Sequence, residues 1–180
     1  MEIEDKLARR AFIRNTFKGL VGAGLLCGIV PFIRSCLPSI SNRALDTPLD
    51  VDISKLEPGD LMTVLWRGMP VWILRRSSSM LQDIDHPRFD LRDPDSLESR
   101  QPADAKNRYR SLHKEYFVAM AKCTHMGCIP LLKQKAFVCP CHGSQFDFAG
   151  RVARAVPAPR NLDIPNYHFS ADGKTLILGA

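Results

Sequence analysis

The hydrophobic pattern near the start of the chain is a run without charges, GLVGAGLLCGIVPFI, which covers Gly19 to Ile33 and ends at Arg34. Fifteen residues in a helix cover roughly 22 Å, which is less than the ~30 Å hydrocarbon core of a bilayer. A membrane span would therefore extend back into residues 12–17 or past Arg34, whose side chain can reach the interface. A run of this kind between basic residues is unusual for a core helix, and we predict a signal or membrane anchor over residues 1–34.

Basic residues precede the apolar run: Lys6, Arg9, Arg10, Arg14 and Lys18. They place the N-terminal side in the cytoplasm. The segment ARRAFI, residues 8–13, resembles a twin-arginine export signal, and the weak cleavage-like motif SIS at residues 39–41 favours a retained anchor. We predict a single-pass protein of a bacterial inner membrane with its head in the periplasm.

Beyond the anchor, residues 35–48 are rich in Ser, Pro and Asn without periodicity, which is typical of a flexible linker. Apolar and polar positions then alternate, and strands are predicted near Met62–Trp66 and Val71–Arg75, between the turn signals EPGD and RGMP. The segments EYFVAMAKC, QKAFVC and KTLILG predict further strands. Residues 77–114 are polar and predict a helix and loop insertion, so the head over residues 49–180 is expected to be mainly β and antiparallel.

The net charge of the chain adds little to this prediction. It is +6 for the whole chain, but residues 1–45 alone carry +4, from seven Lys or Arg against three Asp or Glu. The head has no basic stripe interleaved with aromatic residues, and this excludes nucleic-acid binding as a function class.

Six metal-binding side chains lie within twenty residues: Cys123, His125, Cys128, Cys139, Cys141 and His142. Cys123-x-His125 and Cys139-x-x-His142 form two short clips separated by thirteen residues. Each clip follows a predicted strand, so two loop tips could surround a metal centre. Cys128 and Cys141 are left over, one in each loop.

Three interpretations compete for this cluster. A structural zinc site usually keeps its Cys pair and its His pair in separate clips, which differs from the mixed clips here. A scaffold built only on disulfides suits an exported protein but leaves both histidines without a role. A 2Fe-2S centre with two Cys on one iron and two His on the other accounts for the mixture, because each clip gives one ligand to each iron.

The motifs CTHMGC and CPCHGS resemble the two signatures of Rieske iron-sulfur proteins. The similarity extends through DPDSLESRQPADAKNRYRSLHKEYFVA before them, GRVARAVPAPRNL after them, WRGMPV and the anchor. It indicates the Rieske subunits of bacterial quinol-to-cytochrome c oxidoreductases, the cytochrome bc complexes. The resemblance implies an antiparallel β-sandwich head with a small cluster-binding subdomain at about residues 120–162.

The resemblance also implies residue roles. Cys123 and Cys139 would bind one iron and His125 and His142 the other, while Cys128 and Cys141 would form a disulfide between the loops. One 2Fe-2S cluster would be bound, with the Ser144 hydroxyl donating a hydrogen bond to its sulfur. Gly127 and Gly143 would let backbone amides approach the sulfurs. The segment Pro157, Ala158 and Pro159 would cover the cluster. Where the family usually has Tyr, this chain has Phe146, so we expect a lower reduction potential.

The implied function is electron transfer. His142, with His125 as a second exposed ligand, would contact quinol and accept its proton while the cluster takes an electron. The expected partners are cytochrome b and c-type cytochrome subunits in a dimeric membrane complex, with residues 35–48 as the tether of a moving head. The alternatives are the small Rieske subunit of arsenite oxidase, a soluble Rieske ferredoxin, which would lack the export segment and the disulfide pair, and a non-redox interaction domain stabilised by zinc or disulfides.

Overall fold

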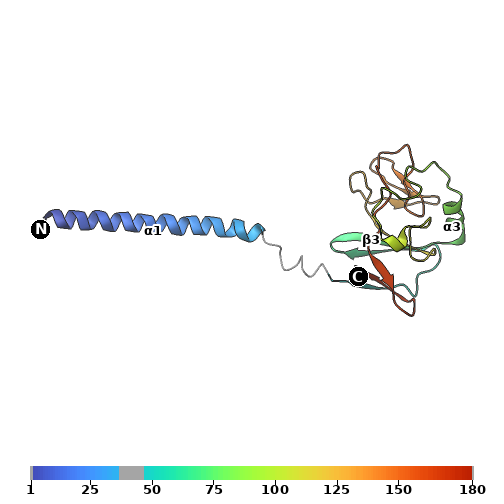
Figure 1. The fold of residues 1–180 in the computed structure, drawn as a ribbon, viewed down its shortest axis with the longest axis horizontal. Coiled ribbons are helices and arrows are strands. Elements are labelled where there is room, and N and C mark those ends of the chain that lie inside the picture. The colour runs from blue at the N-terminus through green and yellow to red at the C-terminus, as the bar shows by residue number, and fades with distance from the viewer. Residues whose placement is uncertain (1, 37–46, 180) are drawn as a thin grey trace. The chain divides into compact units, whose positions relative to one another are not determined.

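The computed structural model describes residues 2–36 and 47–179, and the chain divides into two compact units, Met1–Ala44 and Leu45–Ala180 (Figure 1). The predicted linker, residues 35–48, lies mostly outside the described residues. Its first two positions, Ser35 and Cys36, belong to the N-terminal helix.

The helix α1, Glu2–Cys36, is 35 residues long, or about 52 Å at the helical rise. It continues through the basic flank and the apolar run, so the segment is longer than the run predicted from hydrophobicity alone. Its apolar side chains are exposed, which differs from a core helix, and Asp5–Cys36 is long and apolar enough to cross a membrane. A signal sequence near an N-terminus would meet the same criteria.

The body of the head contains a sheet with strand order β2-β3-β4, formed by β2 Leu61–Trp66, β3 Met69–Arg75 and β4 Tyr116–Met120. The strands are antiparallel, with Val64 opposite Val71 in the first pair. Arg67 and Gly68 join β2 to β3 with φ of 52° and 72°, the combination that a tight two-residue hairpin requires. The predicted meander is confirmed.

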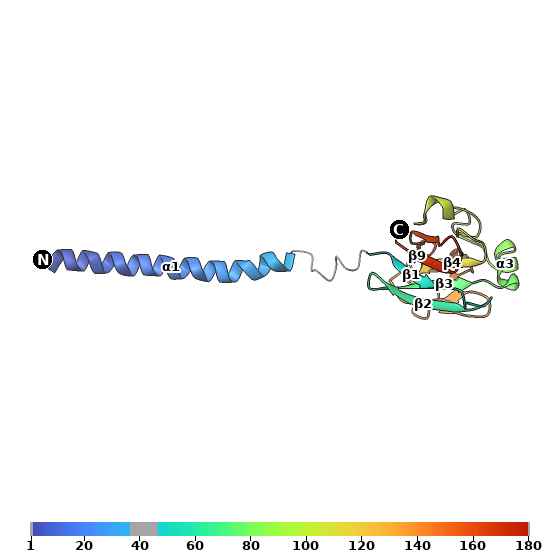
Figure 2. The same cartoon turned by 90° about the horizontal axis from the view of Figure 1, so that it is seen from below.

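A second sheet, in the order β1-β9-β8, joins the two ends of the head sequence. It consists of β1 Leu49–Asp52, β9 Thr175–Leu178 and β8 Tyr167–Phe169. Val51 lies opposite Leu176, and both are buried. Figure 2 shows β1, β9, β3 and β2 gathered in the body of the head, with α3, Ser78–Asp85, at its edge.

The third sheet, β5-β6-β7, is made of three strands of two residues each, Leu131–Leu132, Phe137–Val138 and Gln145–Phe146. Phe137 of β6 stacks on Trp72 of β3 with ring centroids 4.7 Å apart and lies 6.0 Å from Phe117 of β4. All three rings are buried, and each contributes roughly 1.5–3 kcal/mol through burial. The small sheet therefore shares one core with the body of the head, which is mainly β as predicted.

The insertion between β3 and β4 forms α3 and the short 3-10 helix η1, Ala103–Ala105. Ser77 caps α3, its hydroxyl accepting the Met80 N–H at 3.4 Å. The remainder is irregular, as its polar sequence predicted, and its backbone and side chains contact the loops described below.

Candidate metal centre

Two six-residue loops with the same backbone frame carry the predicted ligands. In the first, Cys123 donates its N–H to the Cys128 carbonyl at 2.8 Å and accepts the Gly127 N–H at 2.9 Å. In the second, Cys139 bonds to the Ser144 carbonyl and the Gly143 N–H at the same two distances. A cysteine therefore opens each loop and the backbone closes tightly around it.

Gly127 and Gly143 have φ of 85° and 71°, in the left-handed region where a side chain is strained. At Gly127 a Cβ would also lie 2.9 Å from Cε of Lys122. Both turns therefore need glycine for backbone reasons. That their amides approach the cluster sulfurs stays a prediction.

The Cys123 and Cys139 side chains are free thiols, only 2% and 1% exposed. Burial raises the pKa of the Cys123 thiol above its ordinary value, and the neighbouring Cys139 thiol raises it further, while the His125 backbone N–H and the Ser144 hydroxyl act in the opposite direction. The two thiols are therefore neighbours in a dry site. Bound metal ions would reverse this tendency, because a coordinating thiol is deprotonated.

The two histidines, one from each ligand loop, lie against one another. The His125 and His142 rings have centroids 4.7 Å apart and an edge-to-face angle of 84°. Nδ1 of His125 is buried and has no hydrogen-bond partner within residues 2–36 and 47–179. A buried nitrogen of this kind is rarely left unpaired, so it is suited to a metal ion. His142 is exposed at the loop tip.

A disulfide joins the loops. Cys128 and Cys141 are bonded, with their α-carbons 6.6 Å apart, which confirms the pairing that the resemblance implied. The sulfurs of Cys128, Cys139 and Cys141 lie within 4.8 Å of one another. Because two of these three are already bonded, only Cys139 of this group remains as a thiolate ligand, and the disulfide lies beside it.

A third segment, which we call the covering loop, residues 152–162, lies against both ligand loops. Ala158 donates its N–H to Oγ of Ser144 at 3.0 Å, and Thr124 donates its hydroxyl to the Arg160 carbonyl at 2.6 Å. Ala158 is buried, whereas Pro157 and Pro159 are exposed. The Ser144 hydroxyl thus accepts a hydrogen bond from the covering loop, and its hydrogen bond with the Cys123 thiol lowers the pKa of that thiol.

Phe146 is fully buried in β7, two residues after Ser144. It lies opposite Phe137 in the small sheet and forms a bridge with Val152 of the covering loop. The position where the family usually carries a hydroxyl is therefore part of the core, directly behind the second ligand loop.

Two buried arginines in and beside the insertion were missed by the sequence reasoning. Arg76 donates to the carbonyls of Phe148, Tyr109 and Lys114 at 2.6–2.9 Å. Arg110 donates to the carbonyls of Ala149, Gly150 and Leu162 at 2.8–3.3 Å. Burial lowers the pKa of Arg76 to about 9 and that of Arg110 to about 10, so both stay charged at neutral pH. The two arginines connect the insertion to the segment after the second ligand loop. Their burial could not be predicted, because nothing in the sequence distinguishes a buried arginine from the exposed ones around it.

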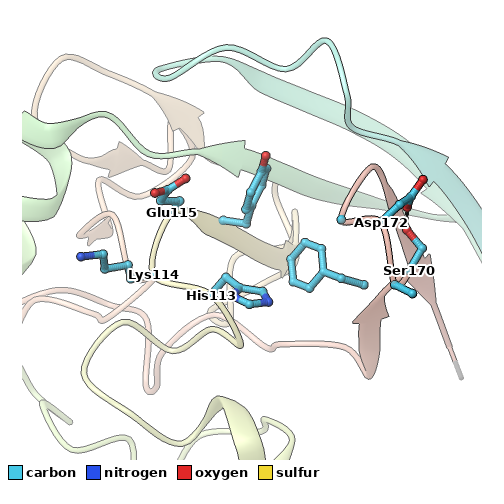
Figure 3. A pocket seen from close by; sticks show the side chains of 9 residues that line it. His113, Lys114, Glu115, Ser170 and Asp172 are labelled. Atoms are coloured by element: carbon cyan, nitrogen blue, oxygen red, sulfur yellow. Dashed lines mark hydrogen bonds between the residues drawn. The ribbon is translucent and has the colours of Figure 1, made fainter.

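Two cavities flank different parts of the head. One of about 350 Å³ borders the first ligand loop and includes Lys122, His125 and Arg160 in its lining. The other, of about 550 Å³, lies between His113–Tyr116 and the β8–β9 turn (Figure 3). Tyr116 begins β4 and Cys123 follows its other end, so the larger cavity is no part of the metal centre.

The chain is similar to known iron-sulfur proteins. Residues 88–168 match the Rieske [2Fe-2S] domain. The ubiquinol-cytochrome c reductase iron-sulfur subunit of Allochromatium vinosum is 44% identical to this chain over 96% of it and 89% of the relative. The corresponding subunit of Bradyrhizobium diazoefficiens is 35% identical over 96% of each chain.

The chain belongs to the Rieske iron-sulfur subunits of ubiquinol-cytochrome c reductase. A solved structure of a hyperthermophilic respiratory complex III contains a similar chain, with 25% identity, a TM-score of 0.51 and coverage of 89% of this chain and 96% of that one. As a Rieske subunit it is part of an oxidoreductase, and its cofactor is a 2Fe-2S cluster. These relatives favour the reductase over arsenite oxidase, and an iron-sulfur centre over zinc.

The residues present fit that cofactor. A Rieske cluster needs two thiolates and two imidazoles. The structure provides two neighbouring buried free thiols and two histidine rings in contact, and both pairs come from the same two loops. The unpartnered Nδ1 of His125 is the polar atom that an iron would satisfy. The predicted site residues thus come together from two loops and one covering segment.

Proposed function

We propose that the subunit transfers one electron from quinol to a c-type cytochrome, with a proton leaving the quinol through a histidine. The observation that carries the proposal is the pair of matching loops, which bring buried Cys123 and Cys139 together with adjacent His125 and His142. Family membership supplies the reaction class.

The four side chains have distinct roles in this proposal. Cys123 and Cys139, the buried pair, would hold one iron of the cluster, and His125 and His142 would hold the other. The bound cluster supplies a one-electron acceptor whose potential is raised by its neutral imidazole ligands, within roughly −150 to +300 mV. The Ser144 hydroxyl, directed at the Cys123 sulfur, would favour the reduced form by hydrogen bonding. The burial of both thiols keeps water away from them.

His142 is the group that contacts quinol, because it is exposed at a loop tip while His125 is half-buried. With one ring nitrogen on the metal, the other nitrogen, once it has lost its own proton, can accept a hydrogen bond from the quinol hydroxyl and then the quinol proton. Exposed Met126 of the first loop and Ile129 directly after that loop supply an apolar surface for a quinone-binding partner.

The proposed setting is a dimeric membrane complex with cytochrome b and c-type cytochrome subunits. In it α1 is the anchor, the N-terminus is cytoplasmic and the head is periplasmic, which suits a disulfide. Residues 35–48 serve as the tether that lets the head reach two partners. Prolines introduced there should slow turnover with an unchanged cluster spectrum, and unchanged turnover would exclude the tether.

Low-temperature EPR of reduced membranes tests the function directly. We expect a Rieske signal that changes when a quinol-site inhibitor is added. Cys139→Ser should abolish the signal, whereas the matched control Cys27→Ser, in exposed α1, should retain it. An EPR signal that the inhibitor leaves unchanged would contradict the quinol role. A normal signal in Cys139→Ser would contradict the assignment of Cys139 as a ligand.

A further inference from the structure

Part of the insertion pairs with the start of the covering loop. Arg92 donates its N–H to the Val152 carbonyl at 2.9 Å, and Arg154 donates its N–H to the Asp90 carbonyl at 2.8 Å. Between these bonds Leu91 bridges Ala153 in antiparallel orientation. Residues 90–92 therefore pair with the start of the covering loop like a short antiparallel strand, although the two segments are about sixty residues apart in the sequence.

This pairing continues the small sheet. Val152 bridges Phe146 of β7 on its other side, and the Ala153 N–H donates to the Gln145 carbonyl at 3.0 Å. The first residues of the covering loop are thus held between β7, which follows the second ligand loop, and the insertion. Any change in the insertion at this point is passed to a backbone that borders the metal centre.

The Arg92 side chain makes a second contact with the same loop. Its Nη2 donates to the carbonyls of Arg154 at 2.9 Å and Val156 at 3.0 Å. Val156 comes directly before Pro157-Ala158-Pro159. Prolines have no N–H, so in this three-residue stretch Ala158 alone can donate from the backbone, and its N–H is already used on Ser144. The loop must therefore be held largely through its carbonyls, and Arg92 supplies those donors.

The far end of the covering loop is fixed differently. Buried Asn161 accepts the Val152 N–H at 2.8 Å and donates to the Asp93 carbonyl at 2.9 Å and to Ser96 Oγ at 3.0 Å. One amide thus ties the end of the loop to its own start and to the residue after Arg92. Because both ends of the loop are held, the hydrogen bond from Ala158 to Ser144 depends on the stretch between them, residues 154–156, to which Arg92 donates.

We propose that Arg92 is a positioning residue that holds the covering loop on the Ser144 hydroxyl and so keeps water away from the ligand thiols. This rests on the assignment of Cys123 and Cys139 as cluster ligands. The Ser144 hydroxyl acts on Cys123 and accepts from Ala158, so a loop released at Val156 weakens the contact that shields the thiol. Because Arg92 is exposed, its removal leaves no cavity and no buried charge, and the effect stays local.

The test uses the whole complex in membranes and three variants. Arg92→Ala removes the donors and Arg92→Lys restores a cationic donor. Arg88→Ala is the matched control, because this exposed arginine of the same insertion pairs with Asp83 instead. The first measurement is hydrogen-deuterium exchange of peptides covering residues 153–160, and the second is the decay of the reduced-cluster EPR signal in the presence of an iron chelator.

We expect Arg92→Ala to raise exchange in residues 153–160 about tenfold or more, as the loss of two charge-assisted hydrogen bonds implies, and to speed chelator-driven signal decay several-fold. Arg92→Lys should recover most of both effects, and Arg88→Ala should match wild type. Wild-type exchange in Arg92→Ala, an equal rise in β3 and β4, wild-type signal decay, or no recovery with Lys would each overturn the proposal. Loop exchange is measured without quinol, so failure of the proposed function would not produce these results.

Discussion

The sheet β2-β3-β4 and the sheet β5-β6-β7 belong to one head, yet they are held by different forces. In the former, β2 and β3 pair over six residues and bury alternate or continuous apolar faces. In the latter, each strand has two residues, too few for independent stability. The ligand loops instead depend on a disulfide, turn glycines and buried arginines. The difference teaches that strand pairing over an extended core holds the body, whereas the metal centre shares that core and depends in addition on individual cross-links.

The disulfide offers the strongest way to break this contrast. The double variant Cys128→Ser with Cys141→Ser should lower the free energy of unfolding by about 3 kcal/mol, as expected for a closed loop of this length, from a sequence separation of 13. Cluster retention should fall with it, because the two loops are no longer joined. Denaturant unfolding and EPR amplitude measure the two effects. The exposed Cys36→Ser control should leave both unchanged, and wild-type behaviour of the double variant would remove the basis of the contrast.

Gly150 lies where the two regions meet, and its substitution gives the next largest effect. Its φ is 69°, and a Cβ would lie 2.7 Å from Phe117 of β4 and 3.2 Å from Leu162 of the covering loop. We expect Gly150→Ala to cost about 2–4 kcal/mol of unfolding free energy from strain and overpacking. Gly173→Ala is the control, since Gly173 has φ of 68° with open space around it, and it should cost about 1 kcal/mol. Equal costs for the two would mean that the close packing at the junction is unimportant.

The smallest effect is expected at Phe146. Phe146→Tyr should raise the reduction potential, because a hydroxyl aimed at the cluster stabilises the more negative reduced form. A charge-directed hydrogen bond is worth at most about 1.5–3 kcal/mol, or tens of millivolts up to roughly a hundred for one electron. Redox titration of the Rieske signal measures the shift, and Ser144→Ala should move the potential in the opposite direction. The absence of an upward shift would show that a hydroxyl at this buried position does not affect the reduction potential of the cluster.

The patterns that the sequence displayed well are those with a local cause. Short apolar, β-rich runs located β2, β3, β4 and β9 to within a few residues. The clips around Cys123 and Cys139 were found from ligand type and spacing. The polar character of residues 77–114 correctly indicated a helix and loops. The strands β5, β7 and β8 were missed because strands of two or three residues have no periodicity to detect.

The sequence by itself therefore determined the class of the head, the apolar N-terminal segment and the chemistry of the six clustered side chains, since these follow from residue type and short-range spacing. Tertiary structure alone decided that β1 pairs with β9 and that Arg76 and Arg110 are buried against backbone carbonyls. It also decided that the insertion grips the covering loop through Arg92. These contacts join segments tens of residues apart, and their energies depend on burial and geometry that no local pattern encodes.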